Sequence, residues 1–60
     1  MKNFQVVLMA PDEQSGEDVT VANVADEAAA RAAVLARFSV QSEAELLEQI
    51  GMNIASVTVL

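Results

Sequence analysis

The chain has 60 residues, with nine acidic and three basic side chains, a formal net charge of -6, and no cysteine or histidine. This length allows one small domain over residues 1–60, and a domain of that size is only marginally stable. The missing cysteines exclude disulfides and zinc–thiolate sites, and the missing histidines remove the commonest transition-metal ligand. Tight packing or association with a partner therefore remains to stabilise the fold.

Residues 3–9 alternate as the residues of a β-strand do. One side of this strand is apolar throughout and is formed by Phe4, Val6 and Leu8. The other side is also apolar at Val7 and Met9. We therefore expect both faces of the first strand to need cover.

Residues 10–18 are predicted to be a loop, because Pro11 and Gly16 interrupt regular structure. This loop holds four carboxylates, which are Asp12, Glu13, Glu17 and Asp18. Residues 19–22 are predicted to form a short second strand. The loop is long enough for this strand to return antiparallel to the first.

A helix is predicted to follow, with Asn23 as its N-cap, and to run to about Phe38. At 100° per residue, one continuous apolar face of this helix contains Val24, Ala25, Ala28, Ala29, Ala32, Leu35 and Ala36. On this reading Ala30 falls on the other side of the helix. Glu27 and Arg31 have the i, i+4 spacing that favours an ion pair.

A second helix is predicted to begin at Ser42, because Ser42 and Glu45 have the spacing of a capping box. Gly51 is expected to end this helix. Residues 53–60 are predicted to form a third strand with strictly alternating faces. In that pattern Ile54 and Val57 lie on opposite faces.

The element order is therefore β-β-α-α-β, which is an α+β fold in a single domain. We predict a three-stranded antiparallel sheet in the order second, first, third strand, with both helices on one face. The other face is then open, and some apolar side chains are left on it. Dimerisation or a partner protein would cover them.

The residue types that catalysis uses most are scarce, so we expect that the chain is not an enzyme. No histidine, cysteine, tyrosine or tryptophan is present, and no base is available to activate the serine and threonine hydroxyls. The acidic loop does not match an EF-hand, since Gln14 and Gly16 occupy ligand positions. No cofactor or metal is therefore predicted.

The strong acidity disfavours nucleic acid and anionic membranes as direct ligands, because only Lys2, Arg31 and Arg37 are basic. A basic protein surface is the natural complement. No stretch is long and apolar enough to cross a membrane, and we expect a cytoplasmic protein. The predicted partner contacts are carboxylates of the loop and of the second helix: Asp12, Glu13, Glu17, Asp18, Glu43, Glu45 and Glu48.

The outline of the chain resembles that of small acidic phage-encoded inhibitors, including anti-CRISPR proteins. The resemblance is carried by a first strand at Lys2–Met9, a short strand leading through Val21, Ala22 and Asn23 into an alanine-rich helix, and a final strand at Ala55–Leu60. It implies a protein that binds part of a nuclease machinery, in some cases in place of DNA. It covers the arrangement of elements and transfers no signature residue.

The sequence thus favours a small acidic protein-binding module. We expect an inhibitor that blocks a basic, nucleic-acid-binding surface of a partner, with mimicry of DNA charge as one form of that inhibition. The alternative is a structural or assembly module that dimerises or pairs through its open sheet face. Both a monomer and a homodimer remain open at this point.

Overall fold

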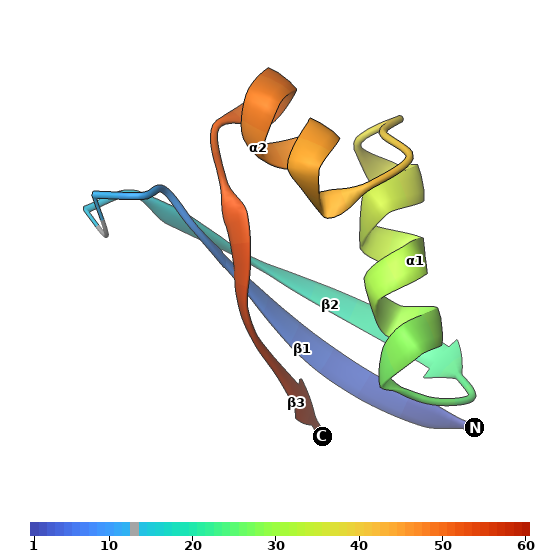
Figure 1. Cartoon of the computed structure of the whole chain (residues 1–60). Helices are drawn as coiled ribbons and strands as arrows, with labels where there is room; N and C mark the ends of the chain where they lie inside the picture. Colours follow the sequence, from blue (N-terminus) through green and yellow to red (C-terminus); the bar gives the residue numbers. More distant parts are fainter. Residues whose placement is uncertain (13) are drawn as a thin grey trace.

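A computed structural model describes residues 1–12 and 14–60. Its elements follow the order β1 (Lys2–Met9), β2 (Gly16–Val24), α1 (Glu27–Arg37), α2 (Glu43–Ile50) and β3 (Asn53–Val59). The sheet has three strands in the order β2-β1-β3, and β1 is antiparallel to both neighbours. Both helices lie on one side of the sheet (Figure 1). The predicted α+β architecture is confirmed.

Strands β1 and β2 form a longer hairpin than the sequence indicates. β2 begins at Gly16 and ends at Val24, so residues 16–18 belong to a strand and the predicted loop 10–18 is shorter. Glycine is needed at position 16, because a Cβ there would lie 2.8 Å from the Leu8 carbonyl oxygen. The hairpin end projects away from the helices (Figure 1).

The core lies between the sheet and the two helices. The buried side of β1 is the one predicted to be apolar throughout, and it meets Val19 and Val21 of β2. From the helical segment the core receives Ala30, Val34, Val40 and Leu46. Small and branched side chains thus build most of the core, and within the described part of the chain Phe4 is its one buried aromatic residue.

Helix α1 begins later than predicted. Its N-cap is Asp26, whose carboxylate accepts a 2.9 Å hydrogen bond from the Ala29 N–H. Asn23 is not the cap: it lies in β2 with a φ of 63°. Its backbone N–H donates to the Asn3 side chain at 3.0 Å. Asparagine tolerates this left-handed conformation, so it turns the strand instead of starting the helix.

The predicted inner face of α1 is wrong for most of its alanines, although Leu35 packs against the core as predicted. Ala30 and Val34 are fully buried, whereas Ala28, Ala32 and Ala36 are exposed. The prediction counted alanines, but an alanine side chain buries little area and fixes a helix rotation weakly. Val34 buries far more area, and the residue one turn before it, Ala30, shares its face. The larger side chain therefore sets which face meets the sheet.

Helix α2 has the predicted ends. The Ser42 hydroxyl accepts a hydrogen bond from the Glu45 N–H at 3.1 Å, and Gly51 adopts a φ of 85° at the C-terminus. The Gly51 N–H donates to the carbonyls of Leu46 and Leu47. These caps fix where the chain leaves α2 and enters β3.

Strict alternation along β3 is also wrong. Val57 pairs with Val6 and Ile54 pairs with Leu8, and both side chains pack against the core. The register shifts between these pairs, which inserts one extra residue at Ala55. The bulge reverses the facing of the residues before it, so Ile54 joins Val57 on the inner face.

Neither α1 nor α2 is long and apolar enough to span a membrane, within the residues that the structure describes.

Candidate partner-binding surface

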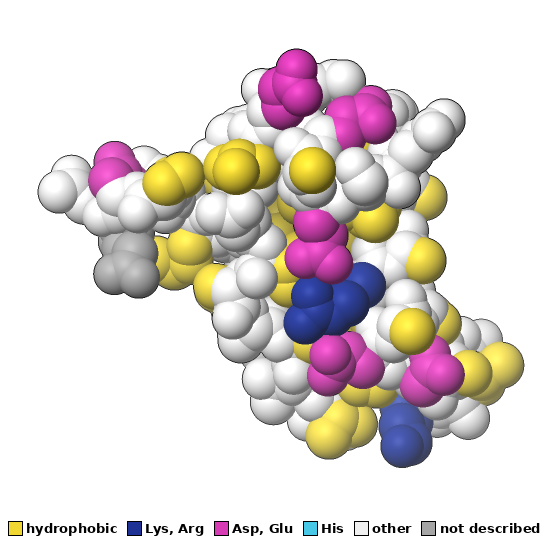
Figure 2. Space-filling view, viewed as in Figure 1, with side chains coloured by type: hydrophobic (Ala, Val, Ile, Leu, Met, Phe, Trp, Pro, Cys, Tyr) yellow, Lys and Arg dark blue, Asp and Glu magenta, His cyan; other side chains and the backbone are white. Residues whose placement is uncertain are grey.

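The carboxylates predicted to contact a partner lie in separate places on the molecule. Figure 2 shows acidic side chains at the end of the hairpin, on both sides of a basic group in the middle, and on the helical end. The hairpin end joins β1 to β2, whereas α2 packs against β3 at the other edge of the sheet. The seven predicted residues therefore divide into a hairpin group and an α2 group.

The turn of the hairpin is held by local hydrogen bonds. The Ala10 N–H donates to the Ser15 carbonyl at 2.8 Å, and the Gln14 N–H donates to Asp12 Oδ1 at 2.9 Å. The second bond is typical of an Asx-turn and orients the exposed Asp12 carboxylate. Glu13, which follows Asp12 in the sequence and is also a predicted contact, lies outside the described residues.

Glu17 and Asp18 project from opposite faces of β2. Asp18 lies opposite Val7 on the open face, where its Oδ2 accepts a 3.1 Å hydrogen bond from Gln5 Nε2. Glu17 lies opposite Leu8, on the side of the sheet that carries the helices. Both side chains are exposed, so the hairpin end is acidic on two faces.

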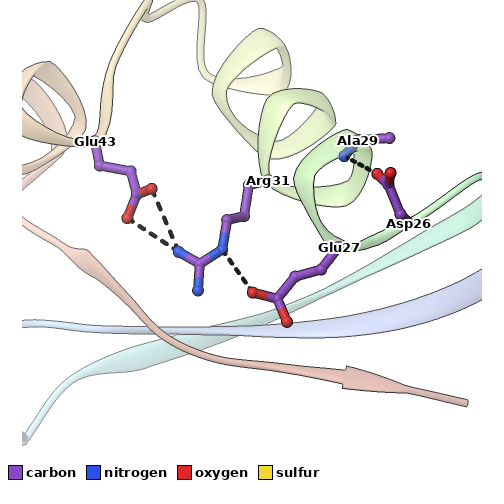
Figure 3. Close-up of polar contacts among 5 residues, drawn as sticks. All are labelled: Asp26, Glu27, Ala29, Arg31 and Glu43. Carbon is purple, nitrogen blue, oxygen red and sulfur yellow. Dashed lines mark hydrogen bonds and ion pairs between the residues drawn. The ribbon is translucent and has the colours of Figure 1, made fainter.

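Arg31 connects the two helices through carboxylates on both sides. Its Nε lies 3.2 Å from Glu27 Oε2, and its Nη1 lies 3.3 Å from both oxygens of Glu43 (Figure 3). The Glu27 pair has the predicted i, i+4 spacing. The Glu43 pair was not predicted, since 12 residues separate the partners and no local spacing indicates it. A partner that bound the Glu43 carboxylate would therefore compete with Arg31 for it.

The other two acidic residues of α2 differ from each other. Glu45 is partly buried and accepts hydrogen bonds from the Gln41 N–H at 3.4 Å and from Gln49 Nε2 at 3.0 Å. Glu48 is exposed, and within the described residues it forms no hydrogen bond or ion pair. Glu17 shares that property on the hairpin. Glu17 and Glu48 are therefore free to meet another molecule without breaking internal contacts.

The basic residues lie away from the hairpin end. No lysine or arginine occurs between Lys2 and Arg31 or after Arg37. Arg31 is already bound to two carboxylates. The hairpin carboxylates therefore keep their charge unneutralised by any base near them in sequence, and they produce a negative potential beyond the strand ends.

The described residues offer no enclosed site. No pocket is found among them, and no group of three carboxylates gathers closely enough to hold a metal ion.

The open face of the sheet is more polar than the first strand alone indicates. Val7 and Met9 lie on it and are partly buried. Their cross-strand neighbours are mostly polar and comprise Gly16, Asp18, Asn53 and Ser56. The apolar surface left on this face is therefore small, and pairing through it has a weak driving force.

Comparison of the chain with protein-family models, curated proteins and solved structures gave no match.

Proposed function

We propose that this chain is a non-enzymatic, acidic protein-binding module whose hairpin end docks on a basic surface of a partner protein. The observation that supports this most is the exposed group of hairpin carboxylates, Asp12, Glu17 and Asp18, with no basic residue near them in the sequence. Such a surface would be steered towards Lys and Arg side chains. Glu13 adds a fourth negative charge to the same turn in sequence.

Basic surfaces of this kind are typical of proteins that bind nucleic acid, because such proteins neutralise phosphates with Lys and Arg. We therefore propose inhibition of a cytoplasmic, nucleic-acid-handling protein as the biological role, with the carboxylates in the place of phosphates. The resemblance to phage-encoded inhibitors such as anti-CRISPR proteins agrees with this role. The α2 residues Glu45 and Glu48 form a secondary contact in this proposal.

Affinity capture with matched variants tests the proposal. The wild type, an Asp12→Lys/Glu17→Lys variant and a Glu45→Lys/Glu48→Lys variant are each immobilised and exposed to a lysate of the natural host. Both variants have the same net charge. We expect a basic nucleic-acid-binding protein to be retained by the wild type, lost from the hairpin variant, and reduced but still present on the α2 variant.

The captured protein is then mixed with labelled duplex DNA and increasing amounts of the wild-type chain. Displacement of the DNA supports inhibition by occupation of its site. Equal retention by the wild type and the hairpin variant would refute a contact through the hairpin, and retention of proteins without any basic surface would refute the electrostatic mode.

A further inference from the structure

Apart from one bulge near its beginning, the outer edge of β3 lacks the features with which edge strands usually avoid pairing. β3 has the sequence Asn-Ile-Ala-Ser-Val-Thr-Val and contains no charged residue and no proline. Its bulge lies near its beginning, at Ala55, and leaves Ser56–Val59 regular. An uncharged, regular and exposed edge rich in β-branched residues readily pairs with another strand.

The other edge of the sheet, β2, is protected. Its first half carries the charges of Glu17 and Asp18, and its second half is distorted at the register shift beside Phe4 and at Asn23, whose φ is 63°. Charges and irregular backbone both oppose addition of a strand. The two edges therefore differ, and β3 is the edge open to pairing.

The hydrogen-bonding groups that face outward on β3 can be assigned from its ladder with β1. The Leu60 N–H donates to the Asn3 carbonyl at 2.8 Å, so this is a hydrogen-bonded pair. Hydrogen-bonded and non-bonded pairs alternate along an antiparallel ladder. The N–H and C=O groups of Val57 and Val59 consequently point away from β1, towards solvent.

We propose that two copies of this chain pair through these edges, with β3 antiparallel to β3 and Val57 opposite Val57. A second copy fits because antiparallel edge pairing is self-complementary under a two-fold axis. The net charge of -6 on each copy opposes association, but β3 is the edge without carboxylates, so pairing there brings no like charges of the two strands together. The result is a continuous six-stranded sheet.

The exposed apolar side chains agree with this pairing. Val59 and Leu60 are 56% and 65% exposed at the end of β3, and Leu47 and Ile50 are 38% and 40% exposed on α2. α2 packs on β3, and Ile50 leads through Gly51 into the beginning of that strand. Antiparallel pairing brings the apolar end of one strand alongside the beginning of the other, next to its α2. Burial of such residues favours association.

The dimer goes beyond the proposed function. It leaves Glu17 and Asp18 accessible, because they lie in β2, which β1 separates from the paired strand β3. The two associations also respond to salt in opposite directions. Screening weakens attraction between the hairpin and a basic partner, whereas it relieves repulsion between two acidic copies. Failure of one is thus distinguishable from failure of the other.

The test uses residues whose side chains are exposed on the open face of β3. In the proposed register Ser56 lies opposite the Thr58 of the second copy. Ser56→Lys/Thr58→Lys and Ser56→Glu/Thr58→Glu each place like charges opposite one another, twice per dimer. By analytical ultracentrifugation we expect each variant to raise the dissociation constant by about tenfold or more. An equimolar mixture of the two variants should restore a heterodimer.

Thr20→Lys/Ala22→Lys is the matched control on the β2 edge, with the same change in charge. It should leave the dimer intact. A wild type that stays monomeric at its highest soluble concentration would overturn the proposal. So would a dimer that survives the β3 variants, is lost in the β2 variant, or does not re-form in the mixture.

Hydrogen exchange on the wild type provides a readout that needs no variant to fold. The amides of Val57 and Val59 should exchange more slowly as the concentration rises, because pairing covers them. The Thr20 amide on the β2 edge should not change. Equal protection at all concentrations would overturn pairing through β3.

Discussion

At the scale of single residues, Arg31 stabilises the contact between the two helices. Its guanidinium contacts Glu27 on its own helix and Glu43 at the first turn of α2. The Arg31 side chain is 35% exposed and its two partners are about half exposed, so solvent screens both pairs. The arrangement fixes the position of α2 more than it adds free energy.

Arg31→Met is therefore expected to lower the free energy of unfolding by about 0.5–1.5 kcal/mol, through the loss of two partly screened ion pairs. Urea unfolding of Arg31→Met, Glu43→Gln and the double variant measures the coupling between the partners. We expect a coupling energy of about 0.5 kcal/mol. A coupling of zero would contradict a stabilising contribution from the pair with Glu43.

Asp26 has a single structural task, since its carboxylate caps α1 at the Ala29 N–H. Asp26→Ala should lower the free energy of unfolding by about 1 kcal/mol, whereas Asp26→Ser, which keeps a capping oxygen, should stay within about 0.5 kcal/mol of the wild type. Thermal unfolding followed by circular dichroism measures both. Equal stability of the wild type and Asp26→Ala would mean that the helix begins elsewhere.

At the scale of the elements, the rotation of α1 decides which alanines are structural. Ala30→Lys places an ammonium group in the core and should cost several kcal/mol, enough to unfold a domain of this size. Ala32→Lys, on the exposed side, should change the free energy of unfolding by less than about 0.5 kcal/mol. Denaturant titration measures the free energy of unfolding of both variants. A larger loss for Ala32→Lys than for Ala30→Lys would support the helix face predicted from the alanine pattern.

These elements also mark what sequence patterns can and cannot predict here. The alternation in β1 and the caps at Ser42 and Gly51 were predicted, because each depends on residues close together in the chain. The bulge at Ala55 and the pair between Arg31 and Glu43 were not, since both depend on how distant segments meet. Among the predicted contacts, only Glu17 and Glu48 are exposed without an internal partner in the described residues.

At the scale of the whole molecule, the exposed carboxylates and the strand edge that is open to pairing lie on different strands. Glu17 and Asp18 lie in β2, at one edge of the sheet, whereas the uncharged strand β3 forms the other edge. A domain this small gains stability from association. Because the hairpin end lies beside the beginning of β3, antiparallel pairing points the two acidic hairpin ends in opposite directions, where each can meet a basic partner of its own.

The central claim is that the hairpin carboxylates bind a basic partner, and Glu17 and Glu48 test it most directly. Glu17→Lys and Glu48→Lys change the charge equally, and neither breaks an internal contact in the described residues. The measurement is the dissociation constant for the captured partner across a range of salt concentrations. We expect Glu17→Lys to weaken binding about tenfold at low salt and much less at high salt, and Glu48→Lys, at the secondary contact, to weaken it clearly less than Glu17→Lys at low salt. Equal affinities of the wild type and Glu17→Lys at low salt, or binding that does not change with salt, would contradict it.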